Sequence, residues 1–416
     1  MSGRARREET VDVVWSGDWV AERLGVALEG DGELRELLGL ALRRNPKRAH
    51  LLVSNVLGKH VPQKPSVVYG AGYGLGERVR ALLGAEEARR AVVLGYAETA
   101  TGLGHAVADG LRDAPYLHST RRPVAGVAPA GGFEEAHSHA TSHLLLPEDP
   151  GLLASASAGG ASALVLVDDE FSTGNTVLNT IRALHELHPR ERYVIVALVD
   201  MRSSADRDRL TAFAAEIGAR VDLVTRAAGT VSLPDGVLER GQALVAEREA
   251  EQAKQAERAA QAGRAQTQAQ AGGPGADADA GEGAGPSGGA DGAAGHSGET
   301  PESPAPLTRV DLGWPAGVPD GGRHGFTPAH RAALEAALPG MAERIAAALG
   351  REPRRVLVLG FEELMYAPLR LGTALEEALG ADTDVRYSTT TRSPVLAVDD
   401  PGYAIRTRLV LSLIHI

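Results

Sequence analysis

Residues 164–176 read LVLVDDEFSTGNT: four apolar residues, an acidic pair, and then a loop of hydroxyl-bearing residues and glycine. The apolar run predicts a strand buried on both faces, as in a parallel sheet covered by helices. A helix is predicted from about Val177 onward, so the polar residues form a strand-to-helix loop. Ligands of open α/β sheets bind beyond the carboxyl ends of the strands, and this loop lies at such an end.

The loop offers two kinds of ligand group. Backbone N–H groups at the start of a helix attract an anion and the hydroxyls add donors, so this part fits a phosphate. Asp168 and Asp169 fit vicinal ribose hydroxyls and Mg²⁺, because carboxylates accept hydrogen bonds and bind hard cations. The alternative is an ordinary turn in which Asp, Ser and Thr act as turn and capping residues. We favour the ligand site, since adjacent carboxylates at a strand end are costly without a cation or donor.

Alternating strands and helices surround this segment from residue 11 to residue 248, which predicts a parallel sheet flanked by helices. Residues 249–306 are first rich in Glu, Gln and Ala, able to prolong a helix to about residue 271, and then rich in Gly. Residues 307–416 return to a helix, strand and helix pattern. We therefore predict an α/β domain at 11–248, a disordered linker at 249–306 that leaves the domain placement open, and a smaller α/β domain at 307–416. The end of the chain, LSLIHI at 411–416, stops inside an apparent strand, and we interpret it as a truncated or frame-shifted terminus.

The composition excludes several classes of function. The formal net charge is -11 and aromatic residues make up 4%, so binding of nucleic acid is not expected. The chain has no cysteine, which excludes disulfides, thiolate nucleophiles and Cys-ligated zinc, and it has no apolar stretch long enough for a membrane span. These features predict a cytoplasmic location.

The segment at 164–176 resembles the diphosphoribosyl-phosphate signature of type I phosphoribosyltransferases: an apolar strand, Asp-Asp, two variable positions, and Ser/Thr-Thr-Gly-x-Thr. The resemblance implies the type I fold and a Mg²⁺-dependent transfer from 5-phosphoribosyl 1-diphosphate (PRPP) to a base-like acceptor, with release of pyrophosphate. It implies that Asp168 and Asp169 contact the ribose and help to hold Mg²⁺, partly through water. It assigns the 5′-phosphate to Ser172, Thr173, Gly174, Asn175 and Thr176.

Upstream segments are candidates for the leaving-group side. The strand AVVLGY is followed by a loop and a helix expected near His105, and by analogy with the family the loop residues Thr99, Ala100, Thr101 and Gly102 bind pyrophosphate. Arg121 and Arg122 follow the next strand, where a bidentate clamp on phosphate competes with an ordinary solvated surface.

Two weaker groups of candidates complete the first domain. Residues 124–143 suit a flexible lid, in which Glu134, His137 and His139 are candidates for a pyrophosphate contact or proton transfer, with plain surface polarity as the alternative. A zinc site there lacks a complete ligand set. Lys59 and His60 lie in a loop that we predict on the acceptor side.

The second domain contains STTTRSPVLAVDD at 388–400, and a phosphoribosyltransferase followed by a Thr-Arg-Ser-Pro (TRSP) motif resembles a bacterial pair associated with tellurium-resistance-type operons. That resemblance implies a role in making a nucleotide- or nucleoside-like metabolite. The segments LGYAETATGLG and YLHSTRRP parallel LGFEELMYAPLRLG and YSTTTRSP, so we hypothesise that the second domain duplicates the pyrophosphate-side half of the first. Arg392 and Ser393 become candidates for binding an anion, with a structural loop as the alternative.

The prediction is a pentosyltransferase with PRPP, Mg²⁺ and an unidentified base-like molecule as ligands. A non-catalytic regulator that senses PRPP or a nucleotide on the same fold is the alternative, because a fold does not fix the chemistry of its site. The sequence does not determine the oligomeric state, and a homodimer is one assembly that it allows.

Overall fold

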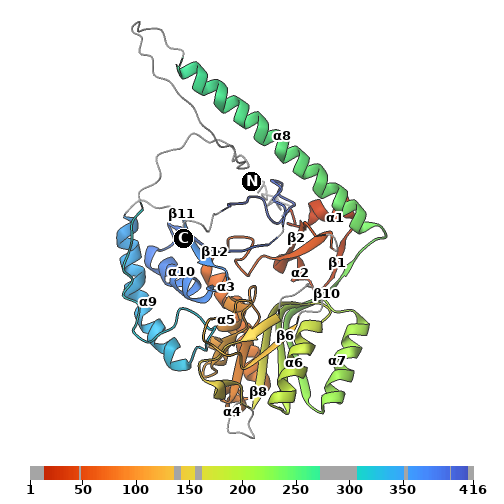
Figure 1. Ribbon diagram of the computed structural model, residues 1–416, viewed down its shortest axis with the longest axis vertical. Coiled ribbons are helices and arrows are strands. Elements are labelled where there is room, and N and C mark those ends of the chain that lie inside the picture. Colours follow the sequence, from red (N-terminus) through yellow and green to blue (C-terminus); the bar gives the residue numbers. More distant parts are fainter. Residues whose placement is uncertain are drawn as a thin grey trace, which may run out of the picture.

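The computed structural model describes residues 14–45, 48–134, 142–154, 162–271, 307–350, 355–393 and 395–410. The main sheet has six strands, five parallel and one antiparallel at the edge. It lies in the lower half of Figure 1, between helices. The predicted parallel α/β architecture is confirmed. In spatial order the strands are β1 (Ala27–Gly30, antiparallel), β10 (Arg220–Ser232), β9 (Arg192–Asp200), β8 (Ala163–Phe171), β4 (Ala91–Gly95) and β5 (Tyr116–His118).

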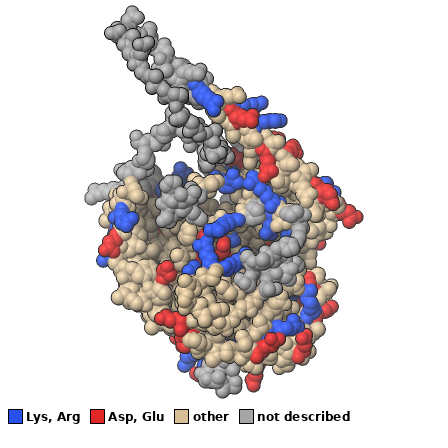
Figure 2. Space-filling view, in the orientation of Figure 1, with Lys and Arg blue, Asp and Glu red and all other residues tan. Residues whose placement is uncertain are grey.

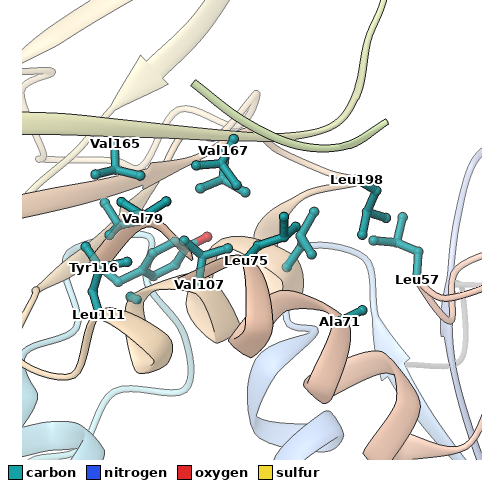
Figure 3. Packing of buried hydrophobic residues seen from close by; sticks show 14 of the residues in the cluster. Leu57, Ala71, Leu75, Val79, Val107, Leu111, Tyr116, Val165, Val167 and Leu198 are labelled. Atoms are coloured by element: carbon teal, nitrogen blue, oxygen red, sulfur yellow. The ribbon is translucent and has the colours of Figure 1, made fainter. Parts of the chain in front are cut away.

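Helices cover both faces of this sheet. Val165 and Val167 of β8 pack against one pair of helices, α3 and α5, whereas Leu164 and Leu166 face the other pair, α6 and α7. Figure 3 shows side chains of α3 and α5 pointing toward Val165 and Val167. Alternate residues of a strand point to opposite faces, so a strand covered on both sides is apolar throughout. The helices are α3 (Pro65–Leu83), α4 (Ala85–Arg89), α5 (Thr101–Leu111), α6 (Asn175–Leu187) and α7 (Ser204–Ile217).

Small residues allow α3 and α5 to pack closely. A Cβ added at Gly76 would lie 2.2 Å from the carbonyl oxygen of Val107 and 2.8 Å from the Cα of Gly110. Gly72, four residues earlier and so on the same face of α3, is also tight against α5. Only glycine fits at this crossing, so the close contact of α3 and α5 depends on these two residues.

A small cap lies beside the main sheet and combines the two ends of the chain. Residues 38–54 form an antiparallel hairpin in this cap, and residues 395–405 extend it. Leu396 N–H donates to the carbonyl of Leu42 (3.3 Å), and Ala404 N–H donates to that of Leu40 (3.2 Å). Trp19, Val395 and Tyr403 share one hydrophobic cluster here, so the end of the second domain completes the cap of the first. The cap elements are α1 (Asp18–Leu24), α2 (Leu34–Leu37), β2 (Leu38–Leu42) and β3 (His50–Ser54).

The second domain is a small α/β unit, as predicted. Two parallel strands, β11 and β12, are joined by α10, and α9 packs against α10. Helix α8 continues through the first part of the predicted linker, whereas residues 272–306 lie outside the described ranges. No described helix is both long and apolar enough to cross a bilayer. The bounds are α8 (Val237–Ala271), α9 (Pro328–Leu349), β11 (Arg355–Phe361), α10 (Tyr366–Leu379) and β12 (Asp384–Thr390).

The second domain packs directly against the first. Phe326 pairs with the edge strand β5, since Tyr116 N–H donates to its carbonyl (2.9 Å) and Phe326 N–H donates back (2.7 Å). The ring of Tyr366 stacks on His105 with 3.9 Å between centroids. Composition alone suggested loosely placed domains, but the described residues share one core because this contact covers apolar surface and an open sheet edge.

The described residues support the proposed duplication. In the first domain β4, α5 and β5 form a βαβ unit in which Gly95 pairs with His118. In the second, β11, α10 and β12 form another, in which Gly360 pairs with Thr389. In each unit a tyrosine two residues before that partner donates its hydroxyl to a carbonyl at the start of the helix: Tyr116 to Thr101 (2.9 Å) and Tyr387 to Met365 (3.0 Å).

Candidate active site

The loop after β8 has the backbone of an anion-binding turn. The strand ends at Phe171, Gly174 is left-handed (φ 75°), and α6 begins at Asn175, two residues before its predicted start. The N–H groups of the first helical turn have no partner within a helix, so an anion can bind them. A Cβ at Gly174 would lie 2.9 Å from the ring of Phe171, which leaves room only for glycine. The hydroxyls of Ser172, Thr173 and Thr176 belong to this loop and first turn.

Three carboxylates follow one another at the end of β8: Asp168, Asp169 and Glu170. Asp169 N–H donates to the carboxylate of Asp168 at 3.0 Å. Burial, together with the charge of Asp169, raises the pKa of Asp168 well above its ordinary value, and the same causes raise the pKa of Glu170 to about 7. Carboxylates in such surroundings are stabilised by a cation or by hydroxyl donors.

The carboxylate oxygens at the end of β8 suit a Mg²⁺ ion that oxygen atoms of a ligand also bind. Asp168 and Asp169 offer the oxygen atoms that Mg²⁺ prefers. Within the described ranges, no group of three or more His, Cys, Asp or Glu side chains is placed to hold a metal ion. The two aspartates would therefore share the ion with water and ligand oxygens.

Lys59 reaches the predicted pyrophosphate loop. Its ammonium group donates to the hydroxyl of Thr99 at 2.7 Å. The sequence suggested an acceptor-side position for Lys59, whereas this contact joins it to the loop between β4 and α5. The loop was missed as its partner because residues 59 and 99 are distant in sequence and meet only in the fold.

The surroundings of Lys59 bring the predicted loops together. Burial lowers its pKa, while the nearby carboxylates of Asp169, Glu98 and Asp168 oppose that shift and the charge of Arg121 adds to it. The acidic pair, the loop after β4 and the arginine segment after β5 therefore lie within electrostatic reach of one side chain.

The predicted pyrophosphate residues are divided between loop and helix. Helix α5 begins at Thr101, one turn before its expected start near His105, so Thr101 and Gly102 lie in the first helical turn and Ala100 is the residue before it. A Cβ at Gly102 would lie 3.0 Å from the Cβ of Met365. The beginning of α5 thus faces the second domain.

The arginine segment after β5 is anchored by the second domain. Arg121 and Arg122 are both exposed. The side chain of Arg122 is ion-paired with Glu362, and the backbone N–H of Arg122 donates to the hydroxyl of Thr120 at 3.1 Å. That hydroxyl donates in turn to Glu363 at 2.9 Å. Two carboxylates from the loop after β11 therefore hold this strand end.

The arms of the predicted lid form a hairpin, β6 (Gly131–Glu134) and β7 (Ser142–Leu145). Phe133 is buried and stacks on His143 with 4.8 Å between centroids, and Nδ1 of His143 lies 2.8 Å from the hydroxyl of Ser119. These contacts fix the hairpin to the strand end that carries the arginines. Of the lid candidates, Glu134 ends β6, and His137 and His139 lie outside the described residues.

His60 follows Lys59 and is a neutral group. Burial, then the positive charges of Lys59 and Arg43, lower the pKa of His60 to about 3. A neutral imidazole can both donate and accept a hydrogen bond.

Figure 2 shows Lys and Arg side chains gathered near the middle of one face, with acidic groups among them. The chain thus has a local basic surface although its net charge is -11.

The second domain supplies the predicted Arg392 together with three residues that were not predicted, Arg323, Glu362 and Glu363. Arg392 donates its Nε–H to Glu362 at 2.8 Å, and Ser393 beside it is half-buried. Arg323 donates to Glu363 at 2.8 Å. Glu362 and Glu363 fall in the repeat of the pyrophosphate loop, and that internal similarity was the one available signal for them.

Residues 37–230 match the family model described as "Phosphoribosyl transferase", and residues 320–414 match the model described as "TRSP domain C terminus to PRTase_2". The chain carries a phosphoribosyltransferase domain. The TRSP domain that the sequence predicted follows it. The phosphoribosyltransferase domain places the chain among the pentosyltransferases, in the glycosyltransferase class, which confirms the predicted enzyme class.

Solved phosphoribosyltransferase structures are similar at low identity. They include adenine phosphoribosyl transferase from Trypanosoma brucei (15% identity, 39% of this chain and 65% of that chain, TM-score 0.28). The enzyme from Giardia lamblia gives 18% identity over 46% of this chain and 95% of that chain (TM-score 0.31). Orotate phosphoribosyltransferase from Aeropyrum pernix gives 20% over 46% and 82% (TM-score 0.25). No sequence among the curated proteins matches the chain. The family assignment rests on the two family models.

Proposed function

We propose that the chain transfers the phosphoribosyl group of PRPP to a base-like acceptor and releases pyrophosphate. The observation that carries the proposal is the convergence on Lys59 of the acidic pair, the loop after β4 and the arginine segment after β5. The acidic pair suits the ribose of PRPP, and the loop after β4 and the arginine segment suit its diphosphate. The turn around Gly174, which follows the acidic pair in the chain, suits the 5′-phosphate at the same sheet edge.

Each part of PRPP has its own binding residues. Asp168 and Asp169 accept hydrogen bonds from the ribose hydroxyls, and the turn around Gly174 binds the 5′-phosphate. The pyrophosphate loop with Lys59 and Thr99 binds the diphosphate. Asp168 and Asp169 would hold Mg²⁺ together with oxygen atoms of PRPP, and the ion would neutralise part of the diphosphate charge.

The reaction is a substitution at the anomeric carbon of the ribose. A nucleophilic atom of the acceptor forms a bond to that carbon, the bond to the diphosphate oxygen breaks, and pyrophosphate leaves with the electron pair. Arg121 and Arg122, with Lys59, stabilise the charge that grows on the leaving group. The neutral His60 can hydrogen-bond the acceptor without adding charge. Biosynthesis of a nucleotide- or nucleoside-like metabolite, a cytoplasmic location and a homodimer remain predictions.

Pyrophosphate release tests the proposal. The full chain is incubated with PRPP, Mg²⁺ and fractions of a bacterial metabolite extract, and pyrophosphate is measured by a coupled assay. We expect release that depends on one fraction and is abolished by Asp168→Asn combined with Asp169→Asn. Tight PRPP binding with no fraction-dependent release would contradict transfer and favour the sensing regulator.

A further inference from the structure

One carboxylate of the second domain holds two arginines from different domains. Glu362 accepts from Nε of Arg392 on one oxygen (2.8 Å) and is ion-paired through its other oxygen with Nη2 of Arg122. Glu362 is only 5% exposed, whereas the side chains of Arg122 and Arg392 are 45% and 64% exposed. The carboxylate lies beneath the two guanidinium groups, which face solvent.

The backbone around this carboxylate is held in an unusual conformation. Glu362 has a φ of 46°, in the left-handed region that non-glycine residues rarely adopt, and its N–H donates to the hydroxyl of Thr390 (3.2 Å). The next residue, Glu363, is equally buried and binds Thr120 of the first domain and Arg323 of the second. Both carboxylates are therefore fixed by contacts on each side of the domain boundary.

The charges at this boundary favour an anion. Arg122, Arg392 and Arg323 carry three positive charges against the two carboxylates of Glu362 and Glu363. Each guanidinium has five N–H donors, and Arg122 and Arg392 each use one side-chain N–H on Glu362. The remaining donors suit a multiply charged oxyanion, since guanidinium groups bind phosphate oxygens in bidentate fashion.

We propose that Arg392 and Arg122 form a two-arginine clamp for the diphosphate group of the donor, with Glu362 as the residue that positions both. The inference rests on the proposed function and adds that the site is shared between the domains. In the repeat Arg392 occupies the position of Arg121. The second copy, which lacks an Asp-Asp-x-x-Ser/Thr-Thr-Gly loop, contributes its arginine to the site of the first copy.

The test separates the two ends of the donor with two probes, inorganic pyrophosphate and ribose 5-phosphate, each titrated with Mg²⁺ into the full chain by calorimetry. Arg392→Ala should weaken pyrophosphate binding by about 10-fold to 100-fold and leave ribose 5-phosphate binding unchanged, because lost charge-assisted hydrogen bonds are of that size. Arg392→Lys should recover only part of the loss, since lysine keeps the charge without the planar fork.

Arg386→Ala is the matched control. Arg386 is also paired with a carboxylate, Asp384, at 2.8 Å, but it lies near the start of β12, six residues and roughly 20 Å along the chain from Arg392. We expect no change in either probe for this variant.

The position of Glu362 gives a second readout. Glu362→Gln makes the clamp more positive but loses one of its two arginine contacts, so a positioning role predicts weaker pyrophosphate binding. Tighter binding by this variant, or unchanged pyrophosphate binding by Arg392→Ala, would overturn the proposal. If the unmodified chain bound neither probe, the proposed function itself would fail, which is a distinguishable outcome.

Discussion

Replacing Gly76 by alanine tests the helix contact that sets the position of the pyrophosphate loop. The added Cβ would lie 2.2 Å from a backbone oxygen of Val107 and 2.8 Å from the Cα of Gly110, so the backbones must separate by about 1 Å to reach ordinary contact distances. Overpacking of this kind costs about 1–3 kcal/mol. The gain in helix propensity offsets only about 0.5–1 kcal/mol.

Gly74→Ala is the control on the same helix. No atom lies within 4 Å of a Cβ added at Gly74, so this variant should be stabilised by about 0.5–1 kcal/mol. Two identical substitutions two residues apart should thus differ in the midpoint of urea unfolding followed by circular dichroism, with Gly76→Ala the lower. Equal midpoints would refute the close crossing of α3 and α5.

Three further predictions concern the site and the repeat. Burial raises the pKa of Glu170 from 4.5 to about 7, so this side chain gains its charge as the pH rises through 7. Mg²⁺-dependent PRPP binding, measured by calorimetry, should therefore strengthen from pH 6 to 8, and less steeply in Glu170→Gln. An equal dependence of PRPP affinity on pH in both proteins would exclude a contribution of Glu170. The same shift should lower the free energy of unfolding as the pH rises from 4.5 to 7, since the folded form binds the proton more tightly. His60, with a pKa near 3, should show no titration by NMR between pH 8 and 5, and a midpoint near 6.5 would disprove its burial. Tyr116→Phe and Tyr387→Phe each remove a hydroxyl bond to a helix start (2.9 and 3.0 Å), so each should lose about 1 kcal/mol in thermal unfolding, and a loss in only one would argue against equivalent repeats.

Local sequence was sufficient for the strand-loop-helix at 164–176. The unbroken apolar run before Asp168 follows from burial on both faces, and Gly174 marks a left-handed turn. The start of α5 was misplaced by one turn because Thr101 and Gly102 are weak helix formers, and the packing of α5 on α3 outweighs that preference.

Contacts between segments that are distant in the sequence could not be predicted from local sequence patterns. The contact between Lys59 and Thr99 could not be predicted from local sequence because the two residues are forty positions apart. Glu362 and Glu363 lie more than two hundred residues from Arg122 and Thr120, across a Gly-rich segment whose composition suggests independent domains. Only the internal repeat related these regions, and similarity between repeats does not show that one copy packs on the other.

Donor binding by the acidic pair is the central claim, and one calorimetric comparison tests it. PRPP with Mg²⁺ is titrated into the full chain, into Asp168→Asn with Asp169→Asn, and into Asp399→Asn with Asp400→Asn, the other Asp-Asp pair of the chain. The first double variant should lose at least about 100-fold in affinity, since two charged acceptors of the ribose are removed, and the second should bind like the unmodified chain. Unchanged PRPP affinity in the Asp168 and Asp169 variant would contradict the account.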